Sequence, residues 1–146
     1  MITENLIKLF TRDLIRLKEE INLYTEEEKI WEVKEGISNS GGNLCLHLCG
    51  NLQYFIGAIL GDSGYIRNRE AEFKLKNITR TKLVDEIEAT ITVVTDTLEQ
   101  VTKKDLEKDY SLQVFGEPMT TEYFILHLAG HLNYHLGQIN YHRRFI

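Results

Sequence analysis

The chain has 146 residues, of which 42% are hydrophobic and 27% are charged. This length suits one domain with a sizeable core, and the composition is that of a folded protein rather than a disordered one. The net charge of −5 offers no basic surface of the kind that nucleic acid or an anionic membrane requires. We therefore expect a single domain over residues 1–146 with no nucleic-acid or membrane partner.

The first residues of the chain lack a basic region followed by an apolar run, so no secretory signal is expected. No segment approaches the roughly twenty apolar residues of a membrane span. A cytoplasmic protein is expected, in which Cys45 and Cys49 are free thiols. On a regular helix each lies about 160° around the axis from His47. Small buried thiols are therefore favoured over metal ligands.

The first helix is predicted from an N-cap at Thr3 to about Tyr24. Residues 25–28 then match a capping box that opens a short turn towards Trp31, and composition predicts a loop over 34–42. The apolar stripe of this first helix is Leu6, Leu9, Phe10, Leu14, Leu17 and Ile21.

The second helix is predicted to begin at a cap, Ser40 or Asn43, and to run to about Leu60, where residues 61–64 end it. A polar, irregular connection is expected over 65–79. The inward residues of this helix are Leu44, Leu48, Leu52, Phe55, Ile56 and Ile59.

The third helix is predicted over roughly 81–101, followed by an irregular link over 102–119. Its apolar residues are Leu83, Ile87, Ile91, Val94 and Leu98. The last helix is capped by Thr120 or Thr121 and runs nearly to the end of the chain. Four helices of about twenty residues predict an all-α four-helix bundle, and the two long connections indicate crossovers.

Four of the five histidines lie in the last helix, and His127, His131 and His135 are four residues apart. Such residues share one face of a helix, and neutral imidazole is the commonest transition-metal ligand. This face borders the apolar stripe, so its side chains point into the bundle. His47 lies at the edge of the apolar face of the second helix. Two facing helices can supply imidazoles to one metal in this way.

Spacing alone leaves two interpretations open, because a histidine on an apolar face is often only a hydrogen-bonded packing residue. Three neutral nitrogen ligands would leave positions on a metal open to water or substrate, which is typical of catalytic rather than structural sites. His142 is expected at the surface near a frayed chain end, beside Arg143 and Arg144.

The segments NLCLHLCGN (43–51) and HLAGHLNYHLGQI (127–139) together resemble the DinB-like (damage-inducible) superfamily over essentially the whole chain. The resemblance implies a four-helix bundle of up-down-down-up topology, often a homodimer, with a nickel or zinc ion held by three histidines. Those positions are His47, His131 and His135 here. His127 is then a supporting or packing residue, and Gln138 orients a ligand or braces the helix.

The resemblance also extends to the charged segment 67–73, and it implies chemistry on small-molecule substrates. Characterised members of the superfamily include transferases and isomerases that use low-molecular-weight thiols. Our leading hypothesis is metal-dependent transfer of such a thiol to an electrophile. The alternatives are metal-assisted hydrolysis, for which Glu70 and Glu72 are the only candidate bases, and a non-catalytic, stress-associated binding module.

Overall fold

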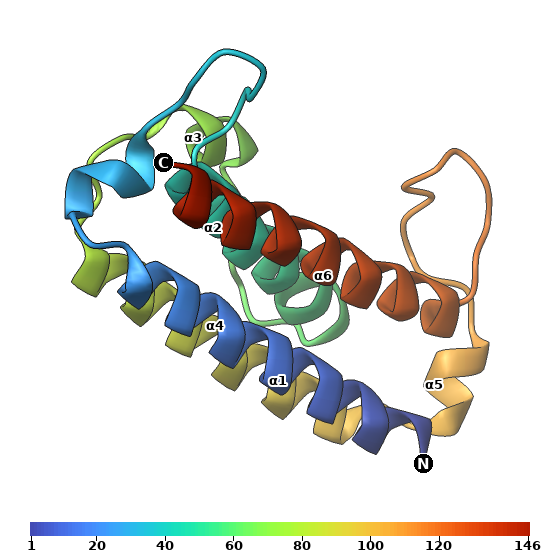
Figure 1. Cartoon of the computed structure of the whole chain (residues 1–146). Coiled ribbons are helices and arrows are strands. Elements are labelled where there is room, and N and C mark those ends of the chain that lie inside the picture. The colour runs from blue at the N-terminus through green and yellow to red at the C-terminus, as the bar shows by residue number, and fades with distance from the viewer.

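The computed structural model describes residues 1–146, and they form helices without a β-sheet (Figure 1). The long helices are α1 (Ile2–Leu23), α2 (Gly41–Leu52) with its continuation η2 (Gln53–Leu60), α4 (Arg80–Gln100) and α6 (Thr121–Phe145). The short ones are η1 (Glu27–Trp31), α3 (Arg69–Lys74) and α5 (Lys103–Glu107).

The four long helices form a bundle in which α1 and α6 run one way and α2 and α4 run the other (Figure 1). Both α1 and α2 pack against α4 and α6. The parallel pair, α2 and α4, requires a crossover between them, and residues 61–79 provide it. The predicted four-helix bundle with up-down-down-up topology is confirmed.

The core is one cluster of 26 buried apolar residues drawn from all four long helices and from the segments that connect them. The predicted stripes of α1 and α4 supply a large share of it. Leu9 is the exception in α1, since 38% of its surface is exposed at the edge of the stripe. Ile91 in α4 is only partly buried and packs against the cluster.

The second predicted helix changes its geometry half-way. After Leu52 it widens into a π-helix, in which the amide of Gly61 donates to the carbonyl of Ile56, five residues back, at 3.0 Å. A helical wheel drawn at 100° per residue assigns residues to the wrong faces in such a segment, because a π-helix turns by a smaller angle per residue. Phe55 and Ile59, predicted to face inward, are therefore only partly buried, whereas Ile56 is fully buried.

Both long connections contain a short helix that periodicity did not predict. In 65–79 the Asn68 side chain accepts a hydrogen bond from Ala71 and caps α3. In 102–119 Thr102 and Asp105 form a capping box at the start of α5. The expectation of irregular connections was wrong here, because helices of five or six residues are too short to show a periodic pattern.

The two cap candidates of the second helix have different roles. Ser40 is the N-cap, and its hydroxyl accepts from the amide of Asn43 at 3.1 Å. The side-chain amide of Asn43 donates to the carbonyls of Glu72 at 2.9 Å and Leu75 at 2.8 Å. Asn43 thereby fixes α3 against α2, one turn before His47.

One segment, Gly41–Leu60, is apolar and long enough to cross a membrane by length and composition alone, with a mean hydropathy of 1.2. The expectation that no segment approaches a membrane span overlooked it. In the bundle, 67% of this stretch is buried, as in the core helix of a soluble protein.

Replacing Gly42 with alanine is expected to destabilise the protein by about 1–3 kcal/mol, because the new methyl group would overpack a rigid ring. A Cβ at this position would lie 2.7–2.8 Å from three atoms of the Trp31 indole. Gly130→Ala is the matched control: its Cβ would meet nothing within 4 Å, and alanine should stabilise the exposed helix by up to about 1 kcal/mol. Urea unfolding measures both, and equal stability of the two variants would contradict the packing argument.

Candidate metal centre

Helices α2 and α6 bring His47, His131 and His135 together. Their candidate ligand nitrogens all lie within 4.8 Å of one another, and the Nε2 atoms of His47 and His131 are 3.2 Å apart. The ring centroids of His131 and His135 are 4.5 Å apart, as expected for residues four apart on one helical face. His47 is buried and the other two rings are partly exposed. The cluster therefore opens to solvent on the α6 side.

The second ring nitrogen of His47 is held by a carboxylate. Its Nδ1 lies 3.0 Å from Oε1 of Glu72, on α3. Arg67 donates to both oxygens of Glu72, from Nε and Nη2, each at 2.9 Å. Because the contact from Arg67 to Nδ1 itself is longer, 3.4 Å, we assign the ring proton to Nδ1, donating to Glu72. This leaves the lone pair of Nε2 facing His131.

The Arg67–Glu72 ion pair is itself buried, with 10% and 7% of the side chains exposed. Burial alone would raise the pKa of Glu72, but the hydrogen bonds from His47 and Arg67 outweigh it and hold this pKa below its usual range. The carboxyl is therefore ionised near neutral pH. An ionised acceptor strengthens the hydrogen bond that orients His47.

A glycine makes room for this carboxylate. A Cβ at Gly50, on α2, would lie 2.0 Å from Oε2 and 2.7 Å from Cδ of Glu72. Any larger residue would push the carboxylate away from His47, which lies three residues earlier on the same helix.

His135 is oriented by Gln138, whose Oε1 lies 2.6 Å from Nδ1 of the imidazole. This matches the expectation that Gln138 orients a ligand. Burial, and to a lesser degree the neighbouring His47, lowers the pKa of His135, although the bond from Gln138 opposes the shift. A neutral His135 protonated on Nδ1 presents a free Nε2 to a metal.

Among the three clustered histidines, His131 has the most strongly shifted pKa. Burial first, and then the neighbouring His135 and His47, lowers its pKa to about 4. It is therefore neutral at physiological pH, the form that binds metals. Its Nδ1 is one of only two buried side-chain polar atoms without a partner, and the other is Oδ1 of Asn51. Asn51 lies one turn after His47 on α2, so both unpaired atoms belong to the helices that carry the cluster.

These features fit a divalent transition metal. Two imidazoles are already tied by their Nδ1 atoms, as metal-ligating histidines generally are. The 3.2 Å between the Nε2 atoms of His47 and His131 is close to the roughly 3.3 Å that separates two nitrogens on a tetrahedral metal with bonds of about 2.0–2.1 Å. The unpaired Nδ1 of His131 is not the nitrogen that faces His47, so Nε2 is the atom that His131 would offer to a metal. The three histidines are thus positioned to hold a metal ion.

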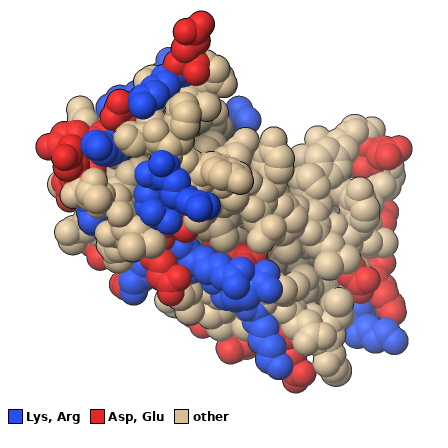
Figure 2. Space-filling view, viewed as in Figure 1, with Lys and Arg blue, Asp and Glu red and all other residues tan.

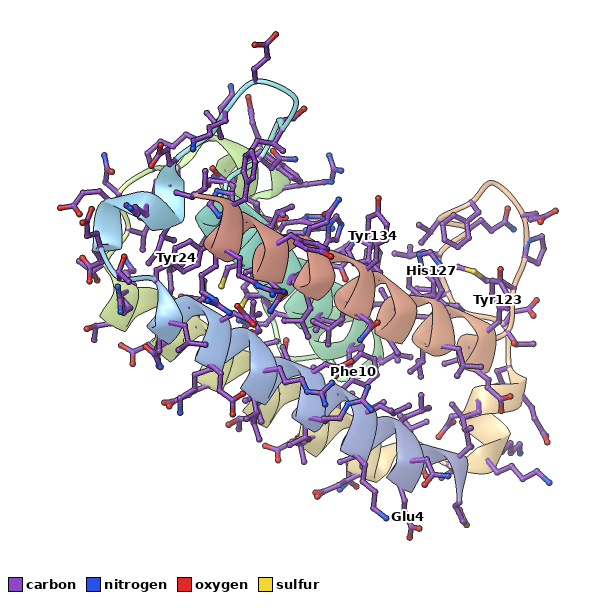
Figure 3. The ribbon with its side chains drawn as sticks, viewed as in Figure 1. Glu4, Phe10, Tyr24, Tyr123, His127 and Tyr134 are labelled. Carbon is purple, nitrogen blue, oxygen red and sulfur yellow. The ribbon has the colours of Figure 1, made fainter.

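The remaining histidines lie outside the cluster. His127 is exposed and packs its ring against Phe115 and Phe124, with centroid distances of 4.8 Å and 5.9 Å. Figure 3 shows it on the face of α6 that also carries Tyr134. This agrees with a packing role, one turn from the centre.

The expectation that His142 lies at the surface was wrong. It is 6% exposed, and its Nδ1 accepts a hydrogen bond from the hydroxyl of Tyr24 at 2.5 Å. Its Nε2 donates to the carbonyl of Glu32 at 2.7 Å. Burial lowers the pKa of the imidazole, despite the opposing effect of the Glu32 carbonyl. The end of α6 is thus held by the connection between α1 and α2, and Figure 3 shows Tyr24 at that end of α1.

Cys45 and Cys49 are free and buried. They lie outside the group of side chains that could hold a metal. The hydrogen bond with Cys49 and then burial raise the pKa of Cys45, so this thiol is protonated and unreactive. The interpretation of these cysteines as packing residues fits their positions.

The two acidic residues of the charged segment have unlike environments. Glu70 is exposed and pairs with Lys74 on the surface of α3, whereas Glu72 is buried against His47. The sequence indicated Glu72 only as a candidate base for hydrolysis and did not predict its contact with His47. The residues are 25 positions apart, and no local pattern reveals that contact.

Several aromatic rings surround the centre. Phe73 lies against His47, with centroids 4.8 Å apart, and the Arg67 guanidinium lies 5.6 Å from the ring of Phe55. Figure 2 shows a hollow in the surface between two projecting connections, the one that precedes α2 and the one that precedes α6. The surface of this hollow is largely free of charged residues.

Comparisons with known proteins agree with this architecture. A family model described as a protein of unknown function, DUF1572, matches residues 4–146. The crystal structure of a DinB-like protein from Bacillus cereus is similar with a TM-score of 0.75 and 20% identity, covering 97% of this chain and 90% of that one. The structure of a conserved protein from Enterococcus faecalis is similar with a TM-score of 0.80 and 16% identity, covering 99% and 96%. No curated protein matches the sequence.

Replacing Glu72 with alanine is expected to release the His47 ring, because the acceptor for its Nδ1 proton is removed. In the metal-free protein, ¹⁵N NMR of the imidazole should change from one tautomer to a mixture. Zinc affinity should fall about 10–100-fold, the usual effect of losing such a partner.

Two further variants make this test specific. Glu72→Gln keeps an acceptor oxygen and should retain the tautomer, and Glu70→Gln, on the exposed side of the same helix, should change neither property. A His47 tautomer that is the same in wild type and Glu72→Ala would show that Glu72 does not orient the ring.

Proposed function

We propose that this chain, which belongs to the DUF1572 family and has a DinB-like four-helix fold, is a metal-dependent enzyme. His47, His131 and His135 would hold one divalent transition ion, zinc or nickel. The convergence of these three side chains from two helices is the observation that carries the proposal. Three protein ligands leave coordination positions for a substrate, as in catalytic rather than structural sites.

The reaction we propose is transfer of a low-molecular-weight thiol to a small electrophile. A bound divalent metal supplies Lewis acidity, which lowers the pKa of a thiol and so favours the thiolate. The protein's own part is to orient His47 through Glu72 and His135 through Gln138, while burial favours the neutral forms of His131 and His135. The partly exposed rings of His131 and His135 leave the cluster accessible from solvent.

The surroundings of the cluster favour this reaction over hydrolysis. Activation of water generally benefits from a nearby general base. Both oxygens of Glu72 already accept hydrogen bonds, from Arg67 and from His47. Glu70 lies at the surface, where it pairs with Lys74. Thiol transfer does not need such a base, because a thiol is far more acidic than water.

The same proposal includes a cytoplasmic location and a homodimeric state. The buried free thiols of Cys45 and Cys49 suit a reducing cytoplasm. The exposed apolar residues along α1, among them Ile2, Leu9 and Leu23, offer a face on which two copies could pair as a homodimer.

Metal analysis of untagged protein tests the ligand set. We expect about one transition metal per chain in wild type and almost none in His47→Ala or His131→Ala, because removing one of three ligands disrupts the site. His127→Ala is the matched control, since His127 lies on the same helix outside the cluster, and it should retain the metal. The metal-free protein should stay folded, because its core of 26 apolar residues does not depend on the ion.

A wild-type protein that retains no metal after loading and dialysis would overturn the proposal. The histidines would then be packing residues, and a non-catalytic binding module would be the better description.

Thiol consumption tests the reaction. Zinc- or nickel-loaded protein is incubated with bacillithiol, mycothiol or glutathione and a panel of alkyl and aryl halides, and the free thiol is measured. We expect metal-dependent consumption with at least one pair, reduced by more than about 100-fold in His131→Ala, because the ligand set is then incomplete. No consumption by fully metal-loaded protein across the panel would rule out the transferase assignment.

A further inference from the structure

We infer that the cavity at the C-terminal half of α6 binds the uncharged, ring-bearing part of the electrophilic substrate. The cavity has a volume of about 810 Å³, within the usual range for small-molecule sites. Residues 36–39 and Leu44 form one wall. The other wall is a single face of α6 between Tyr134 and Phe145. The role as a substrate site rests on the proposed function, whereas the ligand chemistry rests on the cavity alone.

The cavity adjoins the candidate metal centre through two shared residues. Gln138 lines it and is also the residue that holds Nδ1 of His135, at 2.6 Å. Tyr134 lines it too, with its ring centroid 5.2 Å from that of His135. A molecule in the cavity would therefore lie against the side chains that position a metal ligand.

The lining determines the charge of the ligand. None of its eleven residues is Lys, Arg, Asp or Glu. The one titratable imidazole, His142, is kept neutral by burial, with Nδ1 bonded to Tyr24 and Nε2 to the Glu32 carbonyl. An ion in this cavity would lose water without gaining a partner of opposite charge.

The lining also indicates a ring. The side chains of Tyr134, Tyr141 and Phe145 are 62–73% exposed, on one helical face, and each lines the cavity. Exposed aromatic faces beside a cavity bind flat apolar groups. Ser38, Asn39 and Gln138 add polar groups suited to hydrogen bonds with a neutral ligand.

An anionic ring is the alternative to be excluded. Lys34 lies 5.2 Å from the centroid of Phe145, and Arg144 lies 5.8 Å from that of Tyr141. Both cations touch lining residues without lining the cavity themselves. We therefore place them at the rim, where they are already engaged with the rings.

Three probes of the same shape separate these possibilities: benzamide, benzoate and benzamidine, which are neutral, anionic and cationic. Each is titrated into metal-free protein and followed by two-dimensional ¹H–¹⁵N NMR. Benzamide should bind with a millimolar Kd, as expected for so small a ligand, and should shift the amide signals of Gly137 and Gln138. The two charged probes should bind at least fivefold more weakly.

A pair of glycine variants locates the binding. Gly137 lines the cavity and Gly130 does not, although both lie on α6 and a Cβ on either would meet nothing within 4 Å. Leucine in place of either glycine raises helix propensity, so both variants should fold. Gly137→Leu should weaken benzamide binding at least tenfold by filling the cavity, and Gly130→Leu should leave it unchanged.

The inference is overturned if benzamide does not bind, if Gly137→Leu binds it as well as wild type, or if a charged probe binds as tightly. None of these results depends on the metal. Zinc content measured on separate, zinc-loaded samples of the same proteins tests the proposed function, so failure of one and failure of the other are distinguishable.

Discussion

The candidate centre depends on one buried ion pair, Arg67–Glu72, and on its contact with His47. Burying two charges is costly, and an apolar pair of similar volume is often as stable or more stable. This pair therefore adds little to the bundle, whose core lies elsewhere. Its distinct effect is to place an ionised carboxylate 3.0 Å from Nδ1 of His47. We infer that the pair is kept for the orientation of that imidazole rather than for stability.

The crossover between α2 and α4 makes this pair possible. Asn43 fixes the end of α3 by two hydrogen bonds to backbone carbonyls, and Gly50 leaves room for the carboxylate of Glu72. His47 lies between these two positions on α2. Three positions within about two turns of one helix thus align the connection, the carboxylate and the imidazole. A connection that long is needed in any case to join two parallel helices, and here it also supports the site.

Sequence patterns predicted the parts of this structure that repeat along the chain. Apolar periodicity located all four long helices, and the four-residue spacing of His131 and His135 placed both on one inward face. The patterns could not predict contacts between distant residues, such as Glu72 with His47 or Tyr24 with His142. His142 was misplaced because proximity to the chain end says nothing about which loop packs over it.

Local geometry set a second limit on the prediction. The rotation of Phe55 and Ile59 away from the core follows from the π-helix after Leu52, and a calculation at constant pitch cannot anticipate it. The short helices α3 and α5 were missed for a related reason, since neither contains two full turns. Caps were the available signal: Asn68 and Thr102 both precede a helix start.

Both oxygens of Glu72 already accept hydrogen bonds, so this carboxylate is not free to act as a base, and this affects which nucleophile the centre can use. A free cysteine-like thiol has a pKa of about 8.5, whereas that of bulk water is about 15.7. A thiol therefore needs a shift of only about two units to be ionised near neutral pH, and a divalent cation alone can supply it. A zinc ion can also lower the pKa of bound water to about 7, but the hydrolytic step that follows usually uses a general base to transfer protons. A cluster whose nearest carboxylate is held on both oxygens by Arg67 and His47 is better matched to the more acidic nucleophile.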